Sequence, residues 1–329
     1  MKPKVLVTGA NGYTGSNLSQ YLARNGVPTR AMYWAPDGQP AYGHENLELV
    51  AGDLRDRDSL KRALDGVDVV HNIAALYRPT NIPNRMYWDV NVDGIRNIVE
   101  LAAEAGVKRF VQCSTVGVYG DVENPPANEE TPAKPDDYYQ HTKLKGEELS
   151  RELGQELGLP IVIVRPAGIY GPLEDRFLKL PKLIQNGKFV MFGDGTAMYH
   201  FIHIDDLCAA FVLCAERDEA VGQTYVIADD HPIAIRDIVA LMADSLGQPV
   251  PKLQLPLFVL QTASVICEFA CKPFRISPPL HRRRAHWFYH MRVFDSGKAK
   301  RELGFEPKVA PQDGLKEMVR SYRDAGWLN

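Results

Sequence analysis

The segment GANGYTG at residues 9–15 is the feature that most constrains the fold of this chain. It directly follows residues 4–8, a short run with β-branched side chains of the kind found in a fully buried parallel strand. A helical pattern through Leu18 and Leu22 comes next. Glycines let the backbone turn tightly and approach a pyrophosphate, whose charge the N-terminal amides of a helix receive. Strand, glycine loop and helix in this order therefore predict the opening of a dinucleotide-binding βαβ unit.

Strand-like and helical segments then alternate along the first half of the chain. Parallel strands require helical crossovers, so this alternation predicts an α/β fold with one doubly wound parallel Rossmann sheet. The predicted strands are residues 29–33, 47–51, 68–75 with their loop, 110–115 and 161–164, and the clearest predicted helices are residues 95–105 and 144–157. We interpret His71, in the fourth predicted strand, as a core histidine with satisfied hydrogen bonds.

The composition is that of an ordinary globular protein. The 329 residues include 45% hydrophobic side chains and carry a net charge of −3, which gives no indication of a nucleic-acid partner. The five cysteines are an odd number without metal-ligand spacing, so we expect reduced thiols, a cytoplasmic location and no metal site. The first four residues lead straight into a strand-like run, so secretion is not expected.

Tyr139 and Lys143 form the first candidate for catalytic chemistry. They lie one helical turn apart, so both side chains leave the same helix face. An adjacent ammonium group stabilises a phenolate, which predicts a pKa of Tyr139 below the usual value of about 10. Such a phenol exchanges a proton with an alcohol. A tyrosine and a lysine at this spacing also occur by chance in many proteins, so the pair alone does not decide the function.

Several motifs in order resemble the extended short-chain dehydrogenase/reductase superfamily. They are the glycines at every third position, Gly52-Asp53-Leu54, Val118-Tyr119-Gly120, the Tyr139–Lys143 interval, and the segments 165–172 and 193–207. The resemblance implies that Tyr139 transfers a proton, Thr115 orients the reacting oxygen, and Lys143 tunes the tyrosine and bonds the nicotinamide ribose while the cofactor carries the hydride. It also implies a structural supporting role for Asn91. The implied cofactor contacts are Gly9, Asn11, Gly12, Tyr13, Gly15, Asp53, Leu54, Ala74, Ala75, Ser114, Tyr139, Lys143 and Pro166.

The same resemblance implies the domain organisation and the cofactor. Residues 1–172 would form the Rossmann domain, with residues 200–228 returning to it, and residues 173–199 and 229–329 would form a smaller, discontinuous C-terminal substrate lobe. A homodimer would pair through the helices near residues 85–105 and 139–157. Either NAD or NADP is expected, because Tyr33 and Trp34 stand where relatives carry an acid for NAD or an arginine for NADP. Arg30 is the candidate, though poorly placed, phosphate partner.

Departures from the family pattern bear on the substrate. Gly168 and Tyr199 stand where nucleotide-sugar members carry an asparagine and an arginine that serve the pyrophosphate. Val116 and Gly117 replace the Asp-Glu pair of the sugar 4,6-dehydratases. Both departures disfavour sugar nucleotides and dehydration chemistry.

The C-terminal part favours a hydrophobic substrate. Residues 255–271 are mostly apolar but too short and interrupted to span a membrane, so they are a buried helix, a lid over an apolar substrate, or a membrane contact. A basic and aromatic run at 281–292 follows, suited to lipid headgroups or to a substrate carboxylate. With the ending at residues 294–307, this arrangement resembles the 3β-hydroxysteroid dehydrogenase and sterol-4-carboxylate 3-dehydrogenase branch. The resemblance implies oxidation of a 3β-hydroxyl on a polycyclic lipid.

Three other functions stay open. A nucleotide-sugar epimerase and a reductase resembling the dihydroflavonol reductases share the same motifs. A non-catalytic, cofactor-sensing regulator would not need Tyr139, so replacing Tyr139 with Phe discriminates it from an enzyme. For the leading function, a small hydrophobic molecule is the expected partner, and residues 255–292 are a candidate peripheral membrane contact of a cytoplasmic protein.

Overall fold

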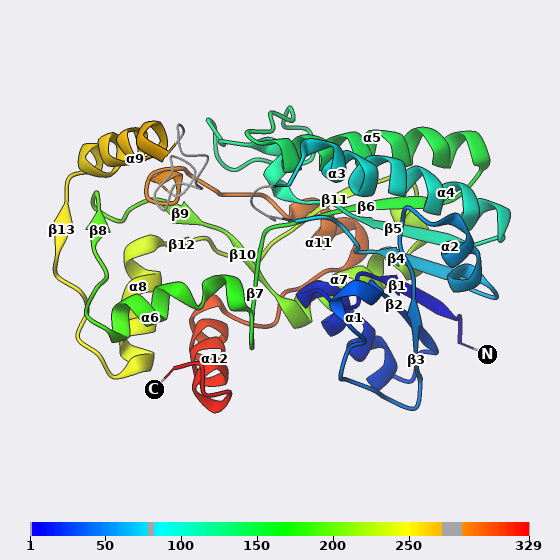
Figure 1. The fold of residues 1–329 in the computed structure, drawn as a ribbon, viewed down its shortest axis with the longest axis horizontal. Coiled ribbons are helices and arrows are strands. Elements are labelled where there is room, and N and C mark those ends of the chain that lie inside the picture. Colours follow the sequence, from blue (N-terminus) through cyan, green and yellow to red (C-terminus); the bar gives the residue numbers. More distant parts are fainter. Residues whose placement is uncertain (1, 78–81, 272–284, 329) are drawn as a thin grey trace.

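A parallel sheet forms the centre of the larger part of the molecule (Figure 1). The computed structural model describes residues 2–77, 82–271 and 285–328. The sheet has seven strands in the order β11-β6-β5-β4-β1-β2-β3, and every neighbouring pair is parallel. Its strands are β1 (Val5–Thr8), β2 (Thr29–Tyr33), β3 (Leu47–Ala51), β4 (Val69–Asn72), β5 (Arg109–Cys113), β6 (Ile161–Pro166) and β11 (Thr224–Ile227). The predicted doubly wound Rossmann sheet is confirmed, and the strand order reverses between β1 and β4.

Helices cover both faces of the sheet, which explains why its strands are almost continuously apolar. Alternate residues of β1 show the two faces: Val5 and Val7 belong to one core, and Leu6 belongs to the other. The first core is closed by α1 (Tyr13–Arg24) and α7 (Ile204–Glu216). The second is closed by α2 (Arg57–Leu64), α4 (Gly94–Glu104) and α5 (Tyr138–Leu157), with α4 and α5 above the sheet in Figure 1.

The helix α5 agrees with the predicted helix near residues 139–157. It begins at Tyr138, where the side chain of Asp137 accepts a hydrogen bond from the N–H of Gln140 at 2.8 Å. It ends at Gly158, whose φ of 68° is the left-handed conformation that glycine adopts freely. This start places Tyr139 and Lys143 in the first two turns of α5, and Lys143 reaches the end of β5.

Two parts of the sheet also differ from prediction. The strand β11 was not predicted as a strand, although residues 200–228 were expected to return to the sheet; it pairs in parallel with β6. The strand β6 continues to Pro166, and β7 (Gly168–Tyr170) follows after one residue and pairs with β10 (Phe201–His203). Much of the segment 165–172, predicted as a loop, is therefore extended and held by neighbouring strands.

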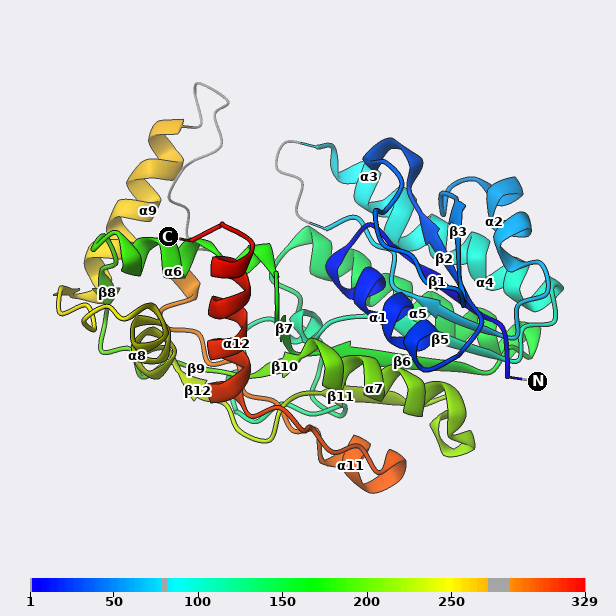
Figure 2. The same ribbon diagram turned by 90° about the horizontal axis from the view of Figure 1, so that it is seen from below.

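A third hydrophobic core lies beside the sheet, among the elements nearer the C-terminus, whose arrangement Figures 1 and 2 show. It gathers buried side chains from residues 170–201 and from residues 233–328, including Met242 and Met318. Its elements are α6 (Lys179–Gln185), α8 (Ile235–Leu246), α12 (Pro311–Asp324) and the strand pairs β8 (Met191–Phe192) with β13 (Gln254–Leu255) and β9 (Met198–Tyr199) with β12 (Ile233–Ala234). The limits proposed for a substrate lobe stay a prediction. The short helix α11 (Gly297–Leu303) packs back on β11.

The apolar run at 255–271 forms a helix, α9 (Leu257–Cys271), that is not buried. Leu260 and Ser264 are its buried residues, whereas Phe258 is 66% exposed and Phe269 is 79% exposed. The interpretation as a buried helix is therefore wrong, since only one narrow edge of α9 packs on the molecule. The basic residues from His281 to Arg284 lie outside the described residues. Across the described ranges, no helix is long and apolar enough to cross a membrane.

Candidate active site

Two glycines allow β1, α1 and the loop after β4 to come close together. Gly9 has a φ of +76°, and a Cβ on it would lie 2.9 Å from the backbone of Ala74. A Cβ on Gly15 would lie 2.2 Å from the carbonyl oxygen of Gly9. Side chains at either position would push these segments apart. Gly12 precedes α1 without a side-chain cap, so the first N–H groups of the helix suit an anion such as a pyrophosphate.

Asn11 and Tyr13 connect the glycine loop to other segments. The side chain of Asn11 accepts a hydrogen bond from the N–H of Trp34 at 2.6 Å and donates one to the carbonyl of Gly38 at 2.8 Å. The hydroxyl of Tyr13 donates to the carbonyl of Pro172 at 3.1 Å. Both residues therefore fix the shape of the loop, and their predicted contacts with a cofactor stay predictions.

The end of β3 carries the residues predicted to contact adenine. Leu54 is buried, and the carboxylate of Asp53 accepts hydrogen bonds from Trp34 Nε1 at 3.2 Å and from Arg55 Nη2 at 2.6 Å. Partial burial opposes ionisation, but the hydrogen bonds and charge of Arg55 hold the pKa of Asp53 below its usual value. Asp53 is therefore an anion shared between an indole and a guanidinium, and Arg55 is a cation at this end that the sequence interpretation did not include.

Arg30 lies away from the ends of the strands where a cofactor phosphate would lie. Its Nε donates to Glu48 at 3.0 Å, and its Nη1 donates to the carbonyls of Arg62, Ala63 and Asp65 at the end of α2. These carbonyls need donors because a helix leaves its last carbonyls unpaired. The suggestion that Arg30 is a phosphate partner is therefore wrong.

A chain of side-chain hydrogen bonds crosses the ends of three strands. Thr8 on β1 donates to Asn72 on β4 at 2.7 Å, and Asn72 donates to Gln112 on β5 at 2.9 Å. The hydroxyl of Thr8 also accepts from the N–H groups of the next loop, including Ala74 at 2.9 Å. This network, which the sequence interpretation missed, holds Ala74 and Ala75 beside the glycine loop.

Ser114 and Thr115 follow β5 and face different surroundings. Thr115 caps a short 3₁₀ turn, because its hydroxyl accepts from the N–H of Gly117 at 3.0 Å. Ser114 is buried, and its hydroxyl oxygen has no hydrogen-bond partner within the described ranges. A buried, unpaired hydroxyl is uncommon in folded proteins and suits a site that holds a ligand.

Lys143 is directed at the end of β5. It is 3% exposed, and its Nζ donates to the carbonyl oxygen of Cys113 at 2.7 Å. Burial lowers the pKa of its ammonium group. This bond places the ammonium at the end of β5, one residue before Ser114 in the sequence. The catalytic roles of Thr115, Tyr139 and Lys143 stay predictions.

The pKa of Tyr139 differs in direction from the prediction. Burial raises it well above its usual value, and Tyr77, Cys113 and Asp137 add to the rise. The predicted lowering by Lys143 is therefore wrong for this structure, because desolvation dominates. The described chain keeps Tyr139 as a neutral phenol.

Two neighbours of Tyr139 were not found from the sequence. The ring of Tyr77 packs edge-on against the ring of Tyr139, with centroids 4.9 Å apart. The guanidinium of Arg176 lies over Tyr77, 5.6 Å from the ring centroid, and its charge opposes the rise in the pKa of Tyr139. Neither residue belongs to a motif, and both reach Tyr139 only through the folding of loops that are distant in sequence.

Asn91 supports the loop that carries Tyr77. Its side chain accepts from the N–H of Leu76 at 2.8 Å and donates to the hydroxyl of Thr142 on α5 at 3.1 Å. This agrees with its interpretation as a structural residue. The bonds connect the loop after β4 directly to the helix that carries Tyr139 and Lys143.

His71 is a core residue of β4. It is 1% exposed, and its ring meets the edge of Phe211. Burial lowers its pKa to about 3, so the ring is neutral. Its Nδ1 finds no hydrogen-bond partner in the part of the chain that the structure describes, so the ring is not fully satisfied as the prediction had it.

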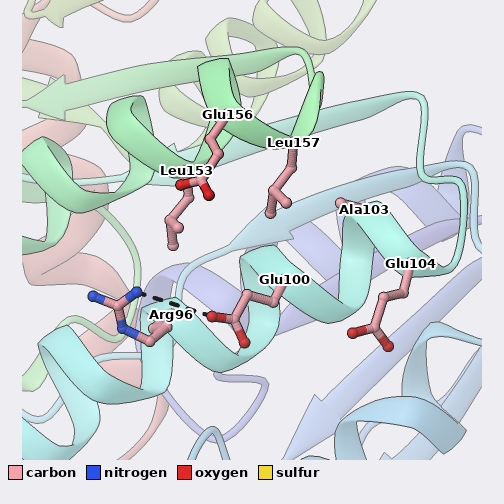
Figure 3. A pocket seen from close by; sticks show the side chains of 7 residues that line it. All are labelled: Arg96, Glu100, Ala103, Glu104, Leu153, Glu156 and Leu157. Carbon is pink, nitrogen blue, oxygen red and sulfur yellow. Dashed lines mark ion pairs between the residues drawn. The ribbon is translucent and has the colours of Figure 1, made fainter.

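Figure 3 shows a hollow on the outer side of α4 and α5. Its α5 residues lie in the last turns of that helix, whereas Tyr139 lies in the first. None of the predicted catalytic or cofactor residues lines the hollow. Its lining residues are Arg96, Glu100, Ala103, Glu104, Leu153, Glu156 and Leu157. It lies on the helices that were predicted to pair two subunits, so it is a surface feature of those helices and not the site of chemistry.

These observations fit a bound dinucleotide and agree with the matching family. Residues 5–228 match the family model described as the NAD dependent epimerase/dehydratase family. The chain belongs to this family. It is therefore an enzyme of the extended short-chain dehydrogenase/reductase type. Three features fit the family's cofactor, NAD: the glycine loop without side chains in the way, the start of α1 without a side-chain cap, and the unpaired hydroxyl of Ser114.

Relatives of this family member include proteins named for sterol chemistry. The chain is 30% identical over 351 residues to 3beta-hydroxysteroid-dehydrogenase/decarboxylase isoform 2 of Arabidopsis thaliana, covering 96% of this chain and only 61% of that relative's length. It is 29% identical over 336 residues to sterol demethylase protein B of Methylococcus capsulatus, covering 98% and 99% of the two chains.

Solved structures share the fold of this chain. The structure of gox2253 superposes with a TM-score of 0.84 at 27% identity and covers all of both chains. UDP-glucuronic acid 4-epimerase from Bacillus cereus, solved in complex with NAD, gives a TM-score of 0.79 at 25% identity, with 98% of this chain and 99% of that chain covered.

Proposed function

We propose that this family member oxidises a secondary alcohol on a hydrophobic, steroid-like molecule, of the 3β-hydroxysteroid or 4-carboxysterol dehydrogenase type. NAD, when bound, supplies the carbon that accepts the hydride. Tyr139, ionised to the phenolate in the complex, would take the hydroxyl proton, so that the alcohol loses one hydride and one proton and becomes a ketone. Thr115 orients the reacting oxygen, and Lys143 bonds the nicotinamide ribose. The reverse reduction uses the same residues in the opposite protonation states.

The aromatic surroundings of Gly168 and Tyr199 are the observation that carries this proposal. A Cβ on Gly168 would lie 2.9 Å from the ring of Phe201, so the larger asparagine of the nucleotide-sugar enzymes does not fit without movement. Tyr199 stacks on Phe201 with centroids 5.8 Å apart and meets Trp287 at 6.2 Å. Apolar rings at these positions favour an apolar ligand over a dianionic pyrophosphate.

The named relatives support the same substrate class. Two proteins similar to this chain carry sterol-related names, and the chain covers 99% of the Methylococcus capsulatus protein. A carboxylate beside the oxidised carbon would turn the product into a β-keto acid, which loses CO2 readily. We therefore include 4-carboxysterols among the proposed substrates.

A nucleotide-sugar epimerase is the second candidate, because one cation does lie at this place. The guanidinium of Arg292 lies over Tyr199, 5.5 Å from the ring centroid. An arginine there suits a pyrophosphate. The two candidate functions are therefore separated by whether the site prefers a steroid or a sugar nucleotide.

Binding measurements separate the two candidates without requiring turnover. The purified chain is saturated with NAD and titrated calorimetrically with a 3β-hydroxysteroid and, separately, with UDP-glucuronic acid. We expect binding of the steroid and weak or no binding of the sugar nucleotide. Tight binding of UDP-glucuronic acid with no binding of the steroid would refute the proposal and favour the epimerase.

For the exposed face of α9 we propose a peripheral contact with a lipid surface, where an apolar substrate would be dissolved. Phe258, Ile266 and Phe269 are each more than half exposed, and α9 lies at the end of the molecule farthest from β3 (Figure 1). Replacing Phe258 and Phe269 with Ser is expected to reduce cosedimentation with phosphatidylcholine vesicles. If the variant cosediments as much as the wild type, or the wild type does not cosediment, the lipid contact is contradicted and a lid is the remaining interpretation of α9.

We also propose a homodimer that pairs through α4 and α5. The exposed Leu157 and the hollow in Figure 3 lie on these two helices. A dimer mass in analytical ultracentrifugation that Leu157→Glu converts to a monomer mass would support this pairing.

A further inference from the structure

Arg176 is held rigidly next to the candidate active site by a buried carboxylate. It lies in the short 3₁₀ turn Asp175–Phe177 that follows β7. Its Nε and Nη2 donate to the two carboxylate oxygens of Glu174 at 2.6 Å and 2.5 Å. The side chain of Glu174 is completely buried. A bidentate pair of this kind fixes the plane of the guanidinium as well as its position.

The guanidinium connects to Tyr139 through one aromatic ring. Arg176 lies 5.6 Å from the centroid of the Tyr77 ring, within the range of a cation–π contact. Tyr77 meets Tyr139 edge-on, at 4.9 Å and an interplanar angle of 68°. The contacts therefore run from Glu174 through Arg176 and Tyr77 to the phenol of Tyr139.

The turn that carries Arg176 is anchored on both sides of the site. The hydroxyl of Tyr13 in the glycine loop donates to Pro172 at 3.1 Å. On the other side, the hydroxyl of Ser321 on α12 accepts from the N–H of Leu173 at 2.9 Å, and the hydroxyl of Tyr322 donates to the carbonyl of Glu174. Arg176 is thus placed by elements of the first and the third hydrophobic core.

We propose that Arg176 is a positioning residue for proton transfer by Tyr139, which it orients through Tyr77 and supplies with a fixed positive charge. The role in turnover rests on the proposed function.

The charges that face Tyr139 agree with this role. Burial, Tyr77, Cys113 and Asp137 all raise its pKa, and the charge of Arg176 lowers it. A phenol must release its proton at moderate pH to serve as a base. The fixed cation therefore acts in the direction that proton transfer requires.

The titration of Tyr139 tests the proposal directly. Protein labelled with carbon-13 at the phenolic carbon of tyrosine is titrated by NMR in the presence of NAD, and the signal of Tyr139 is assigned from its loss in Tyr139→Phe. In Arg176→Met we expect the Tyr139 transition to begin about one pH unit higher than in the wild type. Arg176→Lys, which keeps a charge without the bidentate pair, is expected to recover part of that shift.

A matched control removes a cation from another tyrosine ring. The Nζ of Lys298 lies 5.1 Å from the centroid of Tyr225, on β11. We expect Lys298→Met to leave the Tyr139 titration unchanged. If Arg176→Met folds and its Tyr139 signal titrates as in the wild type, the proposal is overturned. If Arg176→Met does not fold, the proposal is overturned when Tyr139 in Arg176→Lys titrates at the same pH as in the wild type.

Turnover separates this proposal from the proposed function. The NMR titration needs no substrate, so a chain that turns over no 3β-hydroxysteroid contradicts the proposed function and leaves the result for Arg176 standing. Where the steroid is turned over, the pH profile of kcat/KM is expected to shift upwards in Arg176→Met by the same amount as the titration.

Discussion

The ammonium nitrogen of Lys143 donates a 2.7 Å hydrogen bond to the carbonyl oxygen of Cys113. This bond joins the second turn of α5 to the last residue of β5, so the helix that carries Tyr139 is registered against the sheet that receives the cofactor. Lys143 is almost fully buried, and its position is therefore set by the fold rather than by solvent. The end of β5 therefore positions Lys143, the candidate partner of Tyr139 in catalysis.

Replacing Lys143 with Met tests this relationship. The variant loses the ammonium group, so we expect kcat/KM to fall by about 100-fold or more. It also removes one of the two side-chain hydrogen bonds that the carbonyl of Cys113 accepts, since Gln112 Nε2 still donates to it at 2.9 Å, so we expect a loss of only about 0.5–1.5 kcal/mol of unfolding free energy. Steady-state kinetics and urea denaturation measure the two effects. Activity near that of the wild type would remove Lys143 from the mechanism.

Gly15→Ala tests the close approach of the glycine loop. The added Cβ would lie 2.2 Å from the carbonyl oxygen of Gly9, so the loop must open. We expect a loss of about 1–3 kcal/mol in unfolding free energy together with weaker NAD binding. Gly43→Ala is the control, because a Cβ there meets nothing within 4 Å. Equal NAD affinity in Gly15→Ala and wild type would contradict the role of Gly15.

The buried ion pair between Glu147 and Arg165 predicts a large stability effect. The Arg165 Nη2 and a Glu147 oxygen are 2.6 Å apart, and the Glu147 side chain is fully buried. Glu147→Leu leaves the arginine charge uncompensated, at a cost of about 3–5 kcal/mol. On the same helix, Glu148 makes an exposed pair with Lys145, so Glu148→Leu should cost only about 0–1 kcal/mol. Similar melting temperatures for the two variants would count against this difference.

Asp229 predicts an unusual dependence of stability on pH. Burial raises its pKa from 3.8 to about 8, with Asp206 and Asp230 adding to the rise. Because its folded pKa exceeds its unfolded pKa, the folded state binds more protons between these values, and stability falls as pH rises through this window.

The variant Asp229→Asn removes that titration. It should be more stable than the wild type at pH 8 by on the order of 3–5 kcal/mol and show a flatter profile below that pH. Urea denaturation at several pH values measures both profiles. Parallel profiles for the two proteins would show that Asp229 is ionised in the fold at little cost.

Local patterns predicted the sheet and the glycine loop because their causes are local. The glycines at positions 9, 12 and 15 and the apolar strand runs act within a few residues of themselves. Arg176 and Tyr77 could not be predicted in the same way. They lie far apart in sequence and meet beside Tyr139 only through tertiary contacts.

Burial decided the points that were predicted wrongly. The pKa of Tyr139 depends on how deeply the phenol is desolvated, which a Tyr–Lys spacing does not reveal. The apolar composition of α9 likewise does not tell which neighbour covers it, and its outer face is exposed. Arg30 was a candidate partner for the NADP phosphate because it lies in the second predicted strand, but its side chain donates hydrogen bonds to the end of α2.

The most direct test of the account is the rate of NADH formation by the purified chain with NAD and a 3β-hydroxysteroid. The wild type is expected to form NADH in step with the ketosteroid, and Tyr139→Phe is expected to lose most of this rate, by about 100-fold or more, while still binding NAD. Full activity of Tyr139→Phe, or turnover of UDP-sugars with none of the steroid, would contradict the account.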